Sequence, residues 1–340
     1  MIRVLLVLVA WISISLANTN QAIGLVRVAA IRISFQEDNN PGTTGNGSFL
    51  YSAPIDTCGK YTIDPVPHDR SYFESQLLAV SNYFKSVSYN KFGIDMDNSM
   101  VYPISEEGSY VLSNQMNYYH PFNQEEIHDE RITELFRDAI DIAYTTDSIN
   151  FSLYDHIVIF HAGIGQDFSL PFLDPTPEDI PSTFVDKEML DKYLGGSIEI
   201  SNSVIDQGII LPETQNHLFF EDSENIFLNA EEPCDYQYGL TGTFALMLGF
   251  AIGLPPLWDT ETGQSGIGIF GLMDQGSNNG RGLIPAPPDA WTRKHIGWEY
   301  STRIIPPASI NLPSRSENNI IEIPINDDEY FLIENRTNWY

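Results

Sequence analysis

Histidine is the side chain best suited to proton transfer and metal binding near neutral pH, and the chain has seven. His156 and His161 fall in one apolar run, five positions apart, so on a strand they point to opposite faces. His161 is a candidate for a cleft, with a buried structural histidine as the alternative. The others are scattered with no spacing that suits a metal, although a site assembled only in the folded chain stays open: His68, His120, His128, His217 and His295.

Acidic residues offer a second chemistry, calcium binding. Asp259-Thr-Glu261-Thr-Gly263 is similar to a calcium-binding turn, but Phe270 stands where an EF-hand loop has its bidentate glutamate. The segment from Asp167 to Asp186 is also acidic and could hold a structural calcium ion, with a solvated acidic loop as the alternative. Structural calcium is the one cofactor that these residues leave open.

One segment of the chain, between Thr241 and Trp258, has almost no side chains that could bind a metal or transfer a proton. Between Thr241 and Trp258 there is no Asp or Glu, although the chain has 46 of them. Within it, Thr243 to Leu254 (TFALMLGFAIGL) is apolar on every side, which predicts a buried helix too short to span a membrane. Glycine and proline dominate the following segment, Gly263 to Pro288, and predict turns and loops there.

The rest of the chain predicts a mixed α+β fold that positions these residues. Apolar and β-branched runs predict strands at Leu25–Phe35, at Tyr154–Gly163 as a central strand, as a pair within Ser197–Pro212, and at Ile320–Ile325 and Tyr330–Glu334. Apolar residues at helical spacing predict helices over Phe73–Val87 and Ile132–Ile142, and a further helix is expected through Trp291 and Trp298. We expect extended chain over Lys91–Ile104 and a long surface loop over Gln166–Asp186.

The segment from Leu246 to Asp259 (LMLGFAIGLPPLWD) resembles the active-site helix and turn of the immune inhibitor A family of secreted zinc metallopeptidases, the sixth M-class family, which typically reads HEFGHxLGLPDLYD. Further blocks occur in that family's order: Tyr154–Gly163, Gly271–Ser277 (similar to its Met-turn), Pro285–Trp298 and Tyr330–Arg336. The resemblance implies a zincin-like peptidase domain over residues 23–340, a mixed twisted sheet with packed helices, including a buried former active-site helix. Because the last strand nearly reaches Tyr340, we expect a piece cut from a longer domain.

The catalytic positions depart from that family. A zincin binds Zn²⁺ through two histidines one helical turn apart, and the glutamate between them activates the bound water. Leu246 and Phe250 stand at the histidine positions, Met247 at the glutamate position, and Pro256 where a third ligand is often found. Leucine and phenylalanine have no lone pair to donate, and a thioether is a poor zinc ligand. The resemblance therefore implies a fold without its zinc site.

The same resemblance suggests which residues would line the remaining cleft. Met273, which in the family lies beneath the metal, is expected to pack in the core. The other candidates follow it in the Met-turn segment or lie at the end of the central strand: Asp274, Gln275, His161 and Gln166.

The N-terminus predicts export. Arg3 precedes an uncharged run from Val4 to Leu16, followed by Ala17, which is typical of a signal peptide over residues 1–17. A membrane anchor is the alternative, but the run is short for a span, and no later segment is apolar enough to be one. In an oxidising compartment Cys58 and Cys234 could pair or stay thiols, since the sequence does not give their separation.

The charge composition excludes some classes of binding partner. The 340 residues include 17 Lys and Arg against 46 Asp and Glu, a net charge of −29, which argues against binding nucleic acid or an anionic membrane surface. We predict a secreted or surface-located, acidic, bacterial pseudopeptidase that acts as a non-catalytic binding or scaffold module for a protein or cell-surface partner, without a zinc cofactor. The alternatives are an active secreted metalloprotease or other hydrolase with unrecognised metal ligands, and a structural adhesion module.

Overall fold

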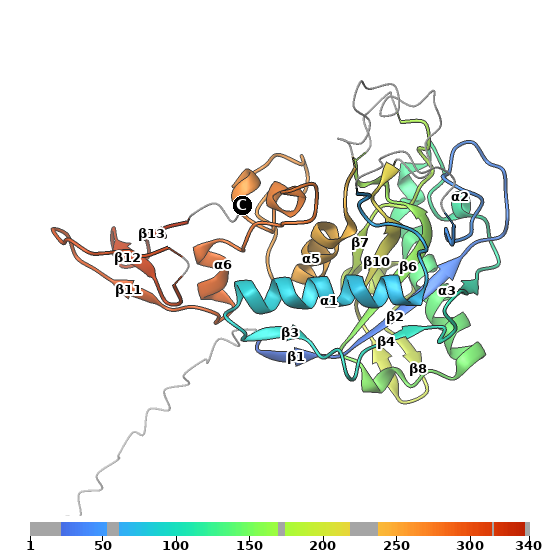
Figure 1. The fold of residues 1–340 in the computed structure, drawn as a ribbon, viewed down its shortest axis with the longest axis horizontal. Helices are drawn as coiled ribbons and strands as arrows, with labels where there is room; N and C mark the ends of the chain where they lie inside the picture. Colours follow the sequence, from blue (N-terminus) through green and yellow to red (C-terminus); the bar gives the residue numbers. More distant parts are fainter. Residues whose placement is uncertain (1–21, 53–60, 169–173, 218–236, 315, 337–340) are drawn as a thin grey trace, which may run out of the picture.

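A central six-stranded sheet organises the computed structural model, which describes residues 22–52, 61–168, 174–217, 237–314 and 316–336 (Figure 1). The strand order is β4 (Met100–Tyr102), β2 (Val28–Ser34), β6 (His156–Ile164), β10 (Gly208–Thr214) and β7 (Thr183–Val185), with β5 (Tyr110–Val111) also on β2. All these strands run parallel except β7, which is an antiparallel edge. The predicted α+β class is confirmed, and β6 is central as predicted.

Helices cover both faces of this sheet. Even-numbered residues of β6, such as Phe160, share a core with α1 (Arg70–Val87) and α5 (Leu240–Ala251). Odd-numbered residues, such as Ile159, pack with α3 (His128–Asp147), beside which lie α2 (Met116–Tyr119) and α4 (Lys187–Tyr193). His156 and His161 therefore lie on opposite faces, as the spacing predicts.

The remaining elements are short. The extended segments pair as β1 (Gly24–Val26) with β3 (Phe92–Ile94), and β8 (Ile198–Ile200) with β9 (Ser203–Ile205). Single turns of 3-10 helix are η1 (Glu125–Ile127), η2 (Phe151–Leu153), η3 (Gln166–Phe168), η6 (Gly268–Phe270) and η7 (Gln275–Asn278). The C-terminal elements are α6 (Ala290–His295), β11 (Ser301–Arg303), β12 (Ile320–Pro324) and β13 (Tyr330–Ile333).

The helices predicted over Phe73–Val87 and Ile132–Ile142 and the two closing strands are confirmed as α1, α3, β12 and β13. The helix predicted through Trp298 is wrong at its end, because α6 stops at His295 and Gly297 has a φ of 83°, a left-handed conformation that terminates helices. Trp298 lies beyond it, fully buried.

The surface loop predicted over Gln166–Asp186 is also wrong. Its described part contains η3 and β7. Within it Asp179 is fully buried and accepts a hydrogen bond from the Thr44 N–H, and the half-buried Asp167 accepts one from the Ser182 N–H.

None of the helices in the described residues has both the length and the apolarity that crossing a bilayer requires. Cys58, Cys234 and the predicted signal peptide lie outside the described residues.

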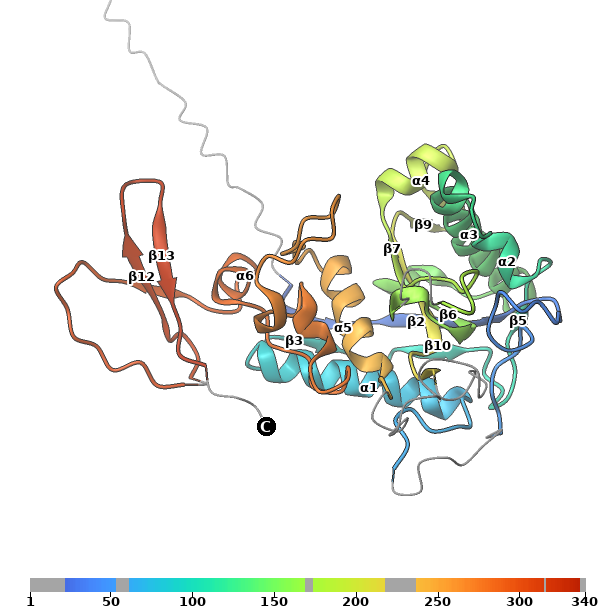
Figure 2. The same cartoon turned by 90° about the horizontal axis from the view of Figure 1, so that it is seen from above.

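Figures 1 and 2 show a small lobe, β11 to β13, projecting from the end of the molecule opposite the central sheet, with α6 between them.

Candidate functional site

Three of the positions that the resemblance aligns with the zinc-binding motif lie on α5: Leu246, Met247 and Phe250. Leu246 and Phe250, one helical turn apart, are both half-buried, whereas Met247 is only 9% exposed and belongs to the core. Pro256 is exposed on the turn that follows the helix. The prediction of a buried helix is therefore confirmed for most of α5, except at Leu246 and Phe250.

Two neighbouring features fix this helix in place. Its first turn is held by Asp64, whose Oδ2 accepts a 2.8 Å hydrogen bond from the backbone N–H of Leu240. Below the helix, a Cβ added at Gly249 would lie 2.7 Å from Met273 Sδ, so only glycine lets the two segments approach this closely. Met273 itself is fully buried, so its expected packing in the core is confirmed.

Leu246 and Phe250 belong to a partly exposed apolar surface, which we call the α5 strip: Leu246, Phe250, Phe184 and Trp258. The rings of Phe184 and Phe250 stack with centroids 6.0 Å apart and planes 17° from parallel. The Trp258 ring meets Phe250 edge-on at 5.6 Å and 77°. The strip thus connects the helix to the edge strand β7 and to the turn after α5.

An open cavity of about 510 Å³ adjoins the strip at the C-terminal end of α5. Gln207 Nε2 donates a 3.1 Å hydrogen bond to the Ala251 carbonyl and so satisfies one of the free carbonyls at the helix end. The cavity is lined by Phe184, Asp186, Lys187, Glu188, Gln207, Phe250, Ala251, Ile252 and Gly253.

Zinc does not fit this arrangement. The side chains at Leu246, Met247 and Phe250 offer hydrocarbon and one thioether, whereas zinc in proteins takes imidazole, thiolate and carboxylate. The described residues also contain no group of three or more His, Cys, Asp and Glu side chains that could hold a metal ion.

His161 and Gln166, two of the predicted cleft residues, do not line this cavity. His161 is fully buried on the α3 side, its Nδ1 lies 2.9 Å from the Ala162 carbonyl oxygen, and burial lowers the pKa of the imidazole to about 4. Its proposed role in a cleft is wrong, because the odd-numbered face of β6 is covered by α3. Gln166 donates to Asp174 at the end of the sheet.

Asp274 and Gln275 also have other surroundings. Asp274 Oδ2 accepts from the Ser265 hydroxyl at 2.9 Å and from the backbone N–H groups of residues 266, 267 and 268 at 2.9, 2.8 and 2.8 Å. Although burial opposes the charge, these hydrogen bonds, that of Gly268 foremost, hold the pKa of Asp274 below its usual range. Asp274 fastens the glycine-rich loop, while Gln275 is exposed.

The acidic segments considered for calcium are occupied by internal hydrogen bonds. Asp259 Oδ1 accepts from the backbone N–H groups of Glu261 and Thr262, both at 2.9 Å, which is an Asx-type turn. Burial raises the pKa of Asp167 and raises that of Asp179 to about 8. The Asp179 carboxyl therefore keeps its proton at neutral pH, which makes it a poor calcium ligand.

A buried polar network that the sequence analysis did not predict lies at the carboxyl ends of β6 and β10. His68 Nδ1 lies 2.7 Å from Glu213 Oε2, both side chains being fully buried, and His68 Nε2 lies 2.9 Å from the Asp64 carbonyl oxygen. Glu213 Oε1 accepts a 2.8 Å bond from the Gly163 N–H, and the Tyr72 hydroxyl donates to the Glu213 carbonyl at 2.8 Å.

The pKa shifts and hydrogen bonds of this network indicate that it stabilises the fold. Burial lowers the pKa of His68, but the hydrogen bond and the charge of Glu213 outweigh it, so the pKa is raised overall. The Asp64 carboxyl, whose pKa burial raises, accepts a 2.9 Å bond from Gln76 and the bond from the first turn of α5. His68 and Glu213 are 145 residues apart, so no local pattern could have predicted the pair.

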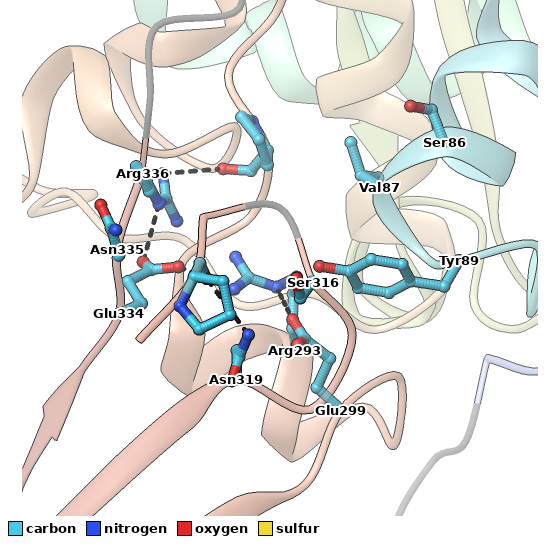
Figure 3. Close-up of a pocket in the computed structure, with 12 residues that line it drawn as sticks. Ser86, Val87, Tyr89, Arg293, Glu299, Ser316, Asn319, Glu334, Asn335 and Arg336 are labelled. Carbon is cyan, nitrogen blue, oxygen red and sulfur yellow. Dashed lines mark hydrogen bonds and ion pairs between the residues drawn. The ribbon is translucent and has the colours of Figure 1, made fainter. Parts of the chain in front are cut away.

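A second cavity, of about 50 Å³, lies where α1, α6 and the C-terminal lobe meet (Figure 3). Glu334 lies 2.7 Å from both Arg293 Nη2 and Arg336 Nε, and Arg293 also pairs with the buried Glu299. Each charge in it thus has an opposite partner, and the space admits only a few water molecules. Its lining residues join the lobe to the body: Ser86, Val87, Tyr89, Pro287, Arg293, Glu299, Pro313, Ser316, Asn319, Glu334, Asn335 and Arg336.

Comparisons of the sequence with family models and with curated proteins found no match.

Proposed function

We propose that this chain is an exported, immune inhibitor A-like protein with a zincin-like fold, in which an apolar surface stands in place of the zinc site and binds a protein partner without cleaving it. The observation that carries the proposal is the pair Leu246 and Phe250 on α5. The resemblance aligns them with the two histidines of the zincin motif; both are half-buried, and Phe250 lines the cavity. Their partial exposure leaves them available for contact, whereas the buried ionisable pair His68 and Glu213 lies elsewhere.

A polypeptide suits this surface better than a small polar ligand. Aromatic side chains are enriched at the centres of protein interfaces, and the α5 strip presents Phe184, Phe250 and Trp258 in mutual contact. Beside them, β7 pairs only with β10 among the described residues, so its outer edge can accept hydrogen bonds from an extended chain. The exposed rim adds Lys187 and Glu188, which supply charge at the border.

Metal content and proteolysis test the loss of catalysis. Purified protein would be assayed for zinc by mass spectrometry, and for cleavage of casein with and without a chelator. We expect no stoichiometric zinc and no chelator-sensitive cleavage. Stoichiometric zinc together with chelator-sensitive cleavage would overturn the proposal in favour of an active metalloprotease.

Peptide selection tests the binding surface. A displayed library of random peptides would be selected on the native protein, and the enriched peptides measured against Phe250→Asp. We expect enriched peptides rich in apolar residues and at least a tenfold loss of affinity in this variant. The matched control is Val204→Asp, at a residue of β9 that is 68% exposed and remote from α5 in sequence. Equal affinity for Phe250→Asp and the native protein would show that the strip is not the binding site.

A further inference from the structure

The projecting lobe exposes an apolar sheet face. Its strand order is β11, β12, β13, and the antiparallel register places Ile321 opposite Ile333 and Ile323 opposite Phe331. Partners directly opposite each other share a face, so these four apolar side chains lie together. Of these, Phe331 is 62% and Ile333 is 44% exposed, whereas Ile323 is half-buried and Ile321 is only 6% exposed, so the exposed part of this face belongs to β13.

The opposite face of the lobe is the one that packs on the body. It carries Glu322, which lies 2.5 Å from Lys294 of α6, and Tyr330, whose ring lies 4.7 Å from the same ammonium group. The contacts with α6 thus involve Glu322 and Tyr330, whereas Phe331 and Ile333 lie on the other face and are exposed.

The edge of the lobe is open as well. Among the described residues β13 pairs only with β12, and its four residues, Tyr330 to Ile333, include no charge and no proline. Natural edge strands are usually protected by lysine, proline or a bulge, because unpaired backbone groups recruit another strand. β13 has no such protection, although it lies beside an exposed apolar face.

The charges around β13 decide what can pair with it. The turn before the strand carries Asp327, Asp328 and Glu329, all exposed, and the whole chain has a net charge of −29. A second copy is disfavoured, because antiparallel pairing centred on β13 would place Glu329 opposite Glu334 of the other copy, and like charges in that position are destabilising. A cationic strand, by contrast, would be attracted by the negative charges around β13.

We propose that β13 accepts an extended, cationic segment of another protein as an added strand, with alternate apolar side chains of that segment resting on Phe331 and Ile333. The main chain of the segment would supply hydrogen bonds, and its Lys or Arg side chains would face the acidic turn. The site is separate from the α5 strip and does not depend on it.

The test uses a synthetic twelve-residue peptide that alternates Lys with Val, labelled for fluorescence anisotropy and measured at physiological salt. We expect binding that falls at least tenfold when alternate peptide nitrogens are methylated, because methylation removes strand hydrogen bonds and keeps the charge. Phe331→Ser should weaken binding by a similar factor, and Val204→Ser, at a site of matched exposure, should not. Neutralising Asp327, Asp328 and Glu329 as amides should weaken binding several-fold and reduce its salt dependence.

Three results would overturn the proposal. Equal binding of the methylated peptide would exclude strand addition. If Phe331→Ser bound the peptide as tightly as the native protein, the binding would be due to the negative net charge and not to the apolar side chains of β13. Dimers of the native protein at micromolar concentration in sedimentation, lost in Phe331→Ser, would show that a second copy occupies the face.

Discussion

The α5 strip and the buried network at the carboxyl edge of the sheet are neighbours, since Asp64 of the network binds the first turn of α5. Their side chains are distributed in opposite ways. On α5 the partly exposed residues are Leu246 and Phe250, whereas in the network the fully buried residues are His68 and Glu213. Exposed apolar groups favour association, and buried ionisable groups with complete hydrogen bonding hold a fold together. This contrast supports our proposal that the first region binds a partner, and it indicates that the second stabilises the fold.

The largest effect is expected in the network. Glu213→Ala would leave His68 buried without its charge partner, and such changes cost about 3–5 kcal/mol in the free energy of unfolding. Urea unfolding would measure it. The control, Lys187→Ala, removes an ion pair with Asp191 whose two side chains are 59% and 52% exposed, and should change stability little. A Glu213→Ala variant no less stable than this control would contradict a structural role for the network.

Introducing the zinc-binding motif into α5 tests whether the α5 strip can bind zinc. The triple variant Leu246→His, Met247→Glu, Phe250→His supplies the motif but places a carboxylate at a position only 9% exposed. We expect the unfolding free energy to fall by more than about 1–3 kcal/mol, the cost of an unpaired neutral polar group, because an ionised carboxylate is costlier to bury. We expect no tight zinc binding, because Pro256 supplies no third ligand. Calorimetric titration with zinc and urea unfolding would measure both, and tight zinc binding would refute our account of the third ligand.

The sequence predicted what depends on local periodicity. Apolar residues from Phe73 to Val87 recur at helical spacing and form α1, and the short apolar run after Tyr154 becomes the central strand β6. The helix α1 buries one face and the strand β6 is buried along its length, and the order of apolar and polar residues in the sequence shows both patterns directly. The same reasoning found that α5 would be apolar and mostly buried.

The remaining features depend on contacts between distant segments. His68 and Glu213 pair across 145 residues, and Asp179 is buried because it accepts bonds from Thr44, 135 residues away. Composition predicted a solvated loop around Asp179, since an acidic residue is normally exposed unless such a partner exists. The sequence also could not predict which residues of α5 are partly exposed, because this depends on contacts with β7 and with the turn at Trp258.

The buried carboxyl of Asp179 makes a prediction about pH. Burial raises its pKa to about 8, so the folded state keeps a proton that the unfolded state releases near pH 4. The stability contributed by this proton is therefore present below about pH 4 and is lost progressively as the pH rises to about 8. Asp179→Asn keeps an oxygen acceptor for Thr44 without the charge, so its melting temperature should exceed that of the native protein at pH 8 by more than at pH 4.5.

The control for this pH dependence is Asp97→Asn, at an exposed position, which should give the same difference at both pH values. His161 acts in the opposite direction. Because its pKa is lowered to about 4, the folded state loses stability as the pH falls from about 6.5 to about 4. A difference between Asp179→Asn and the native protein that does not change with pH would mean that this carboxyl is ionised in the folded protein.

The smallest expected effect tests the assignment of α5 most directly, by comparing two phenylalanines of one helix. Phe244 is fully buried against Phe160, and its replacement by alanine should cost about 3–5 kcal/mol. Phe250 is half-buried, so Phe250→Ala should cost clearly less, about 1–2 kcal/mol, while abolishing binding of the selected peptides. Urea unfolding of both variants gives the comparison. If Phe250→Ala were as destabilising as Phe244→Ala, the strip would be part of the core, and its aromatic side chains would no longer support a binding surface.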